Sequence, residues 1–325
     1  MSVGLRGWWG AALATLVVAV APAAAQGPTP PRVALVAMPY SGARNVPELS
    51  GGPAYLLEGG LEALLREGGV AVEPTATVAL SPADEREYGE WHRMGLANGH
   101  LAEEVAANAR AGVLTVGLLA NCTSVLGVLG GLQQARGRVA LVFIDAHGDF
   151  NVPETTLSGM LGGMPVAVAA GKALERLRRE SGLDPPVPTA RIVMAAVRDL
   201  DPLERELVEA SDIQHLSTGD LRHRPEAVRA QMERLSREAD VIYVHVDMDV
   251  LDPAEVEGHP LTVPDGPTSG ELASALAEMF RFEKVAALGI ASTPYGERDP
   301  TGASRRAAYN LVFGALEGVR ARARR

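Results

Sequence analysis

The sequence predicts an α/β fold in which helices cover both faces of a parallel β-sheet. Short apolar segments rich in Val and Ile alternate along the chain with longer amphipathic segments. Nearly continuous apolar runs are typical of strands that are buried on both faces, and their alternation with helices is typical of a parallel sheet. The active site of such a sheet forms at the carboxyl ends of its strands.

The expected elements follow from these patterns in chain order. The expected strands are Arg32–Met38, Gly69–Glu73, Val113–Gly117, Val139–Ile144, Arg191–Ala195, Val241–Val246 and Lys284–Ile290. The expected helices are Ala54–Arg66, Leu96–Ala111, Thr123–Ala135, Pro202–Ala210, Pro225–Glu238, Ser269–Phe280 and Ser304–Val319. The Pro-rich segment Leu183–Thr189 is expected to be a loop that leads into a strand. We therefore expect one catalytic domain over residues 26–325.

The N-terminus has the layout of a secretory signal peptide. Arg6 precedes an apolar run from Trp8 to Val20, and Ala23–Ala25 offers small residues for cleavage. A membrane anchor is the alternative interpretation, but the apolar run is short for a membrane span. We expect residues 1–25 to be removed and the mature protein to be exported, periplasmic or secreted, without stable membrane insertion.

Composition narrows the range of functions. The chain has 325 residues, of which 47% are hydrophobic, so a sizeable globular core is expected. The net charge of −10 argues against a nucleic-acid partner, which needs a basic surface. An acidic chain remains suited to a cationic small-molecule substrate. We also expect a homo-oligomer.

Two clusters of potential metal ligands follow expected strands. The segment DAHGDFN contains Asp145, His147 and Asp149, and the segment HVDMDVLDP contains Asp247 and Asp249. In an extended backbone alternate side chains share a face, so the members of each cluster are expected to converge. Clustered carboxylates repel one another unless a cation compensates them. Carboxylate and imidazole suit Mn²⁺, Fe²⁺ or Zn²⁺, so we predict a dinuclear metal site.

These two segments, with TSGELASAL after them, resemble the signatures of the arginase–agmatinase (ureohydrolase) family. The resemblance extends in order over most of the mature chain. It implies a three-layer αβα fold of the arginase type that binds two Mn²⁺ ions, other divalent metals being possible. It also implies that Asp145 and Asp247 bridge both ions, that Asp149 serves the first ion, and that His147 and Asp249 serve the second.

The sequence departs from the family at one further expected ligand. The family has a Gly-Gly-Asp-His-Ser segment there, whereas this chain reads LANCTSVLG, with Asn121 for the Asp and Cys122 for the His. Thiolate is a competent ligand, so we expect Cys122 to bind the first ion. A buried apolar role for this lone cysteine is the alternative. The chain resembles an Asn-Cys branch of the family that includes enzymes acting on Nω-hydroxy-L-arginine.

The expected substrate contacts come from the same resemblance. Arginases hold the substrate α-carboxylate with Asn, Thr and Ser side chains, which match Asn151, Thr156 and Ser158. They hold the α-amino group with an Asp that matches Asp201. Turn formation is the alternative role for each of these residues taken singly. Together they favour an amino-acid substrate over agmatine, which has no carboxylate.

The other end of the expected pocket differs from arginase. The family's proton-shuttling His falls at Gly162, and its guanidinium-pairing Glu falls at about Ala291. A guanidinium is always charged and needs a carboxylate partner, so the loss of that Glu weakens the case for L-arginine. A thiolate ligand makes the metals weaker Lewis acids and suits a less basic substrate, such as an Nω-hydroxyguanidine.

The leading hypothesis is a metal-dependent hydrolase that cleaves a C–N bond of a linear amidine in an amino-acid-like substrate. The best candidates are Nω-hydroxy-L-arginine and arginine, with Asp149 holding the attacking water and passing on its proton. The products are urea or hydroxyurea and an amine. A catalytically weak metal- or ligand-binding relative is the alternative. A histone-deacetylase-like amide hydrolase is less favoured, because its usual His-His pair is absent.

Overall fold

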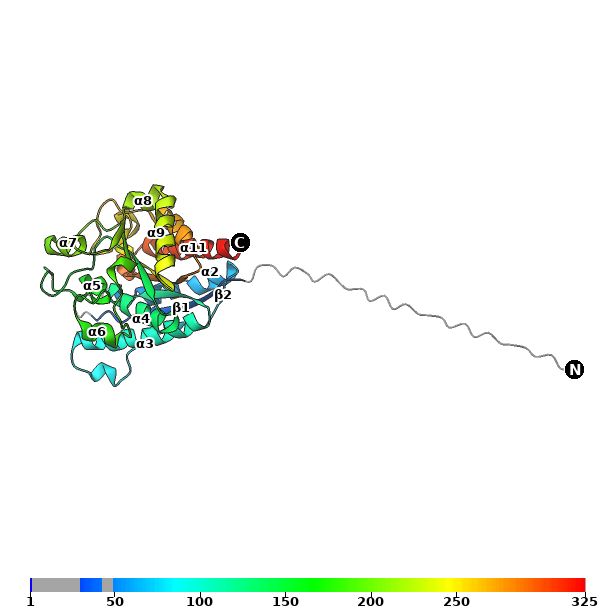
Figure 1. The fold of residues 1–325 in the computed structure, drawn as a ribbon, viewed down its shortest axis with the longest axis horizontal. Helices are drawn as coiled ribbons and strands as arrows, with labels where there is room; N and C mark the ends of the chain where they lie inside the picture. Colours follow the sequence, from blue (N-terminus) through cyan, green and yellow to red (C-terminus); the bar gives the residue numbers. More distant parts are fainter. Residues whose placement is uncertain (2–29, 43–48, 325) are drawn as a thin grey trace.

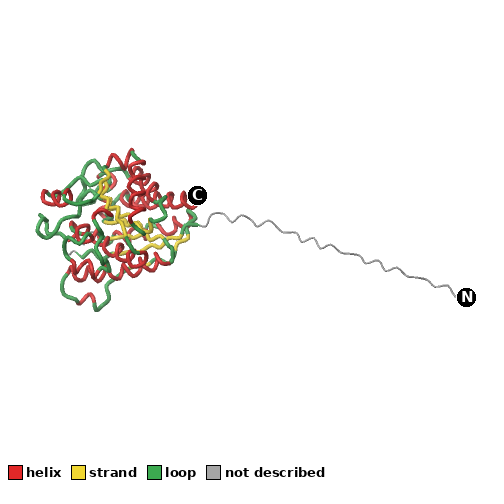
Figure 2. The backbone as a smooth tube through the Cα atoms, viewed as in Figure 1, coloured by secondary structure: helices red, strands yellow, loops and turns green. Residues whose placement is uncertain are grey.

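A computed structural model describes Met1 and residues 30–42 and 49–324. The expected signal peptide therefore lies, apart from Met1, outside the described residues. A nine-stranded parallel sheet runs through the centre of the fold, with helices on both sides (Figures 1 and 2). The strand order is β2-β1-β4-β9-β8-β5-β6-β7, and β3 pairs with β1. The predicted α/β fold with a parallel sheet covered on both faces is thus confirmed.

The strands largely coincide with the apolar segments. They are β1 (Arg32–Met38), β2 (Ala71–Val72), β3 (Ala76–Thr77), β4 (Leu114–Leu119), β5 (Val139–Ile144), β6 (Ile192–Ala195), β7 (Gln214–Leu216), β8 (Val241–Asp247) and β9 (Val285–Ala291). The predicted strand Gly69–Glu73 is shorter than expected, and β3 and β7 were not predicted. These are short strands, and the burial pattern of β7 is exposed, exposed, buried, so they lack the apolar run that marks a central strand.

The helices flank the strands. They are α1 (Gly52–Glu58), α2 (Leu61–Glu67), α3 (Glu90–Arg110), α4 (Val125–Arg136), α5 (Pro165–Ala169), α6 (Glu175–Glu180), α7 (Pro202–Glu209), α8 (Thr218–His223), α9 (Pro225–Glu238), α10 (Ser269–Met279) and α11 (Ala303–Ala323). The predicted helix Ala54–Arg66 is divided at Gly60, whose φ of 91° is left-handed and ends a regular helix. The short helices α5, α6 and α8 were not predicted.

Alternating side chains of the central strands fill two apolar cores, one on each face of the sheet. In β5, Val142 and Ile144 join the core that contains α9, α10 and α11, whereas Leu141 and Phe143 join the core that contains α3 and α4. Because successive strand side chains point to opposite faces, a strand covered on both sides must be apolar throughout. This requirement explains why the central strands were predictable.

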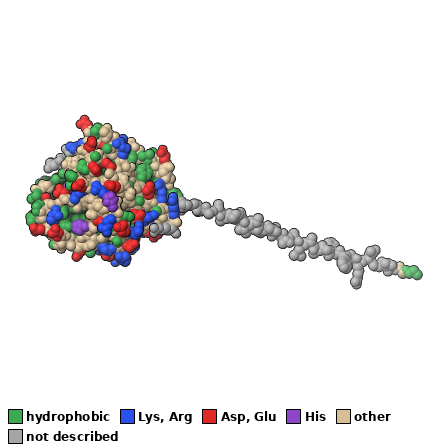
Figure 3. Space-filling view, turned by 90° about the horizontal axis from the view of Figure 1, so that it is seen from above, with side chains coloured by type: hydrophobic (Ala, Val, Ile, Leu, Met, Phe, Trp, Pro, Cys, Tyr) green, Lys and Arg blue, Asp and Glu red, His purple; other side chains and the backbone are tan. Residues whose placement is uncertain are grey.

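The chain has no helix among its described residues that is long and apolar enough to cross a membrane. On the face seen in Figure 3, acidic and basic side chains are intermixed.

Candidate metal centre and active site

Polar residues follow the carboxyl ends of four neighbouring strands in the middle of the sheet. Cys122 lies just beyond β4, Ser292 beyond β9, Asp247 at the end of β8 and Asp145 beyond β5. Although β4 and β5 are consecutive in the chain, β9 and β8 lie between them in the sheet. Such a change in strand order opens a crevice at the carboxyl edge, where ligands bind in α/β proteins.

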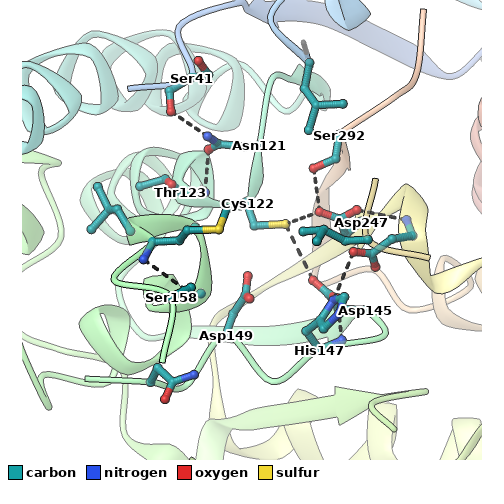
Figure 4. Close-up of a pocket in the computed structure, with 18 of the residues that line it drawn as sticks. Ser41, Asn121, Cys122, Thr123, Asp145, His147, Asp149, Ser158, Asp247 and Ser292 are labelled. Carbon is teal, nitrogen blue, oxygen red and sulfur yellow. Dashed lines mark hydrogen bonds and ion pairs between the residues drawn. The ribbon is translucent and has the colours of Figure 1, made fainter. Parts of the chain in front are cut away.

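The potential ligand atoms form overlapping groups in this crevice. Those of Cys122, Asp145 and Asp149 lie within 4.8 Å of one another, and those of Asp145, His147 and Asp249 form a second such group. Figure 4 shows Cys122, Asp145 and Asp247 coming together from different elements, with His147 and Asp149 beside them. Asp145 belongs to both groups, which is the position that a ligand bridging two ions needs.

Asp247 lies against both groups. Its Oδ2 is 2.6 Å from Cys122 Sγ, and its Oδ1 accepts a hydrogen bond from the Asp249 backbone N–H at 3.0 Å. His147 Nδ1 lies 3.1 Å from Asp249 Oδ2 and 3.5 Å from Asp145 Oδ1. All six side chains that the sequence marks as metal ligands are thus brought together, including the lone cysteine.

The backbone around the first cluster is not simply extended, contrary to the prediction from alternate residue spacing. Asp149 has a left-handed φ of 49°, which is rare for residues other than glycine. Such backbone strain is found at functional sites, where the surrounding fold enforces it. Its carbonyl accepts the N–H groups of Val166 and Ala167, at the start of α5. This bend turns Asp149 toward Cys122 while His147 faces Asp249.

Burial and mutual repulsion make the carboxylates costly to ionise without a cation. Burial, followed by the charge of Asp249, raises the pKa of Asp247 to about 7, and burial and Asp145 raise the pKa of Asp249 to about 6. Burial and neighbouring carboxylates also raise the pKa of Asp145 and Asp149. Divalent cations would remove this penalty, so the donor set fits a dinuclear metal centre.

The two other ligand types respond differently. Burial lowers the pKa of His147, but hydrogen bonds to Asp145 and Asp249 outweigh it and raise the value to about 12. Burial, then the charges of Asp247 and Asp145, raises the pKa of the Cys122 thiol. A thiolate at this position therefore needs a positive charge beside it, which a metal ion supplies.

A buried histidine that was not predicted as a site residue contacts the sulfur of Cys122. His245 Nε2 lies 3.2 Å from Cys122 Sγ, and its Nδ1 lies 2.7 Å from the Tyr243 hydroxyl. The ring stacks on Phe143 with 5.2 Å between centroids, and burial lowers its pKa to about 3. A neutral imidazole that receives the Tyr243 proton at Nδ1 donates its Nε2–H to the sulfur. His245 belongs to the segment that contains the second ligand cluster. Its contact with Cys122 depends on how β8 pairs in the sheet, which the sequence alone does not give.

Asn121, the residue before the cysteine, has a structural role. Its Oδ1 accepts the Thr123 N–H at 3.0 Å, and its Nδ2 donates to the Ser41 carbonyl at 2.6 Å. The first of these bonds caps the short 3₁₀ turn that carries Cys122. Asn121 thus fixes the direction from which the sulfur enters the centre.

The predicted substrate residues lie beside the metal centre in two places. Asn151 and Asp201 line the cavity and contact each other, with Asn151 Nδ2 donating to Asp201 Oδ2 at 3.1 Å. Thr156 and Ser158 lie on the loop that follows Asn151, and their hydroxyl oxygens are 3.4 Å apart. Ser158 lines the cavity, whereas Thr156 caps the turn by accepting the Gly159 N–H and is not among the lining residues.

The cavity itself has a volume of about 450 Å³. Apolar side chains that are at least partly exposed surround the polar residues at its mouth, namely Trp91, Leu157, Met160 and Leu261. Gly162, which the sequence resemblance aligns with the family's His, also lines it, and a Cβ added there would meet no atom of the described residues within 4 Å. The cavity thus has room for a side chain at this position.

The residue that the resemblance aligns with the family's Glu, at about Ala291, has a different environment. Ala291 is fully buried and belongs to the apolar core on the α3 and α4 side. The next residue, Ser292, has a left-handed φ of 59° and donates its hydroxyl to Asp247 Oδ2 at 2.6 Å. Ser292 was not predicted, because an isolated serine after a strand carries no distinctive sequence signal.

His259 is a further lining residue that the sequence analysis missed. It lies in the loop beyond Pro253, and one of its ring nitrogens lies within 4.8 Å of ligand atoms of Asp247 and Asp249. It lies outside both sequence motifs, so no motif spacing identified it as a site residue.

Comparisons with known proteins agree with this architecture. The Arginase family model matches residues 31–316. Human mitochondrial arginase-2 is 28% identical over 68% of this chain and 66% of that protein, and N(omega)-hydroxy-L-arginine amidinohydrolase of Streptomyces lavendulae is 32% identical over 55% of this chain and 60% of that protein. The arginase of Bacillus subtilis superposes with a TM-score of 0.78 at 22% identity, covering 88% of this chain and 98% of that chain.

Proposed function

We propose that this chain, which belongs to the arginase family, hydrolyses a C–N bond of a linear amidine in an amino-acid-like substrate. The observation that carries the proposal is the convergence of Cys122 with the carboxylates and imidazole of two overlapping ligand groups that share Asp145. Two divalent ions, for which we propose Mn²⁺, would supply a water of lowered pKa as the nucleophile. The residues expected to hold them are Cys122, Asp145, His147, Asp149, Asp247 and Asp249.

The chain's own residues have separate parts in this reaction. Asp149 lines the cavity beside Cys122 and is suited to orient the attacking water and move its proton to the leaving amine. Water adds its oxygen to the amidine carbon, the bond from that carbon to the side-chain nitrogen breaks, and the nitrogen leaves as an amine. Asn151, Ser158 and Asp201 face the same cavity and are suited to the α-carboxylate and α-amino groups.

Within this class we propose Nω-hydroxy-L-arginine as the preferred substrate, ahead of L-arginine. The absence of a carboxylate at Ala291 and the thiol in the ligand set both disfavour a fully charged guanidinium. The experiment is turnover by the manganese-loaded mature protein on arginine, Nω-hydroxyarginine, agmatine, guanidinobutyrate and formiminoglutamate. Hydroxyurea or urea must be released from at least one amino-acid substrate. Metal binding without turnover of any of them would favour the second candidate, a metal- or ligand-binding relative, to which Gly162 also points.

We also propose that the protein is exported after cleavage near Ala25, on the strength of the N-terminal sequence alone. Mass spectrometry of the extracytoplasmic protein should find Gln26 or a near neighbour at its start. Recovery of a soluble cytoplasmic form that begins at Met1 would contradict this proposal.

A further inference from the structure

His259 is a buried histidine with one unsatisfied ring nitrogen at the metal centre. Its side chain is 1% exposed, and its Nδ1 accepts the Leu261 backbone N–H at 3.2 Å. Its Nε2 lies 3.7 Å from Asp247 Oδ1, beyond hydrogen-bond range. The Ser292 backbone carbonyl lies near the ring, but Nε2 completes no hydrogen bond with any of the described residues. Buried polar groups are nearly always paired, so an unpaired one in a cavity wall indicates a missing ligand.

The hydrogen bond from Leu261 fixes the tautomer of the ring. A backbone N–H can only donate, so Nδ1 must present its lone pair, and in a neutral imidazole the proton then resides on Nε2. The protonated nitrogen has no lone pair to give to a metal ion. Although His259 is grouped with Asp247 and Asp249 by distance, it is therefore a hydrogen-bond donor to the cavity and not a further metal ligand.

The neighbouring carboxylate does not need this donor. Asp247 Oδ1 already accepts the Asp249 N–H at 3.0 Å, and Oδ2 accepts the Ser292 hydroxyl at 2.6 Å. The natural partner of His259 Nε2–H is therefore an acceptor atom on the molecule that fills the cavity. A guanidinium offers five N–H donors and no acceptor, so it would leave this N–H unpaired.

We infer that His259 is a specificity-determining residue whose Nε2–H binds an acceptor atom on the amidine end of the substrate. An Nω-hydroxyguanidine supplies that acceptor as its hydroxyl oxygen. The inference rests on the proposed function and adds a reason for the preferred substrate: a fixed donor stands in the cavity wall, while Ala291 supplies no carboxylate. With the His259 N–H as a donor and no carboxylate as an acceptor, this end of the pocket favours a substrate atom that accepts a hydrogen bond over one that donates.

The experiment compares His259→Phe, His259→Gln and the unmodified enzyme on Nω-hydroxyarginine and arginine. Phenylalanine keeps a ring but removes the donor, and we expect kcat/KM for hydroxyarginine to fall about tenfold more than kcat/KM for arginine. Glutamine carries an N–H₂ near the place of Nε2 and should recover most of the preference. Both variants should keep two metal equivalents by elemental analysis, because His259 is not a ligand.

Each contrary result has a distinct meaning. Equal losses on both substrates would make His259 a packing residue and overturn the inference, and loss of one metal equivalent in His259→Phe would make it a ligand. If the unmodified enzyme turns over neither substrate, the proposed function fails and the inference falls with it. His100→Phe, which alters a histidine on α3 that is paired with Asp84, controls for the substitution and should leave the substrate ratio unchanged.

Discussion

Replacing Asp247 with asparagine should stabilise the metal-free protein at pH 8 and abolish metal binding. The buried Asp247 carboxyl has its pKa raised from 3.8 to about 7, chiefly by burial and secondly by the charge of Asp249. Because the folded value lies above the unfolded one, the stability contributed by the protonated carboxyl is present below pH 3.8. It is lost as the pH rises toward about 7.

The size of the effect follows from that difference. The interval between 3.8 and about 7 corresponds to about 4 kcal/mol of lost stability at pH 8. Asparagine is neutral at every pH and avoids this loss. It keeps the acceptor for the Asp249 N–H but faces Ser292 and Cys122 with an N–H₂ group, at a cost of about 1 kcal/mol. A net gain of about 3 kcal/mol at pH 8 remains.

The assay is urea denaturation in the presence of a chelator at pH 5 and pH 8, repeated with manganese. Asp247→Asn should show a smaller loss of unfolding free energy between pH 5 and pH 8 than the unmodified protein, and manganese should stabilise only the latter. Asp240→Asn is the matched control, because hydrogen bonds from Arg138 hold the pKa of Asp240 at about 2 and its charge is constant over this range. An Asp247→Asn variant whose pH dependence matches that of the unmodified protein would refute the reasoning.

Three further substitutions test the parts of the centre. Cys122→Ser should lower the affinity for the first metal ion far more than the affinity for the second in a manganese titration. Unchanged affinity at both sites would mean that Cys122 is only a packed apolar side chain. His245→Phe removes the N–H that lies 3.2 Å from the sulfur, so metal affinity at the first site should fall about tenfold. In a Cys122→Ser background the same change should have a smaller effect, and an equal one would exclude coupling through the sulfur. Gly162→His should fold with a melting temperature close to that of the unmodified protein, because its Cβ meets no described atom within 4 Å; a large loss by thermal denaturation would contradict the geometry.

The sequence was most informative where one physical demand acts on every residue of a segment. The central strands β5 and β8 are buried on both faces, so each residue must be apolar and the run is visible without a structure. The ligand clusters at their ends were equally visible. Short edge strands such as β7 have exposed residues and carry no such run, and the glycine that divides α1 from α2 acts through its backbone angle.

The missed site residues share a different property. His259, His245 and Ser292 reach the centre because a loop, a strand pairing or a left-handed backbone angle directs them there, and none of these is encoded by local spacing. Asp149 was placed correctly in the cluster, but the extended backbone expected for it was wrong. Sequence spacing thus predicted which residue types gather, whereas the fold decides which atom of each faces the cavity.

The two positions that the resemblance aligns with arginase's His and Glu differ in what side chain they can accept. Gly162 lies at an open cavity wall, so an imidazole can be returned there without displacing described atoms. Ala291 is fully buried at the end of β9 among apolar side chains, and a glutamate there would have to bury its charge or displace the packing. Gly162→His alone therefore leaves a guanidinium without its carboxylate. Any gain in arginine hydrolysis from that variant should be small until the end of β9 is also rebuilt, because proton transfer cannot compensate for a substrate that is not held.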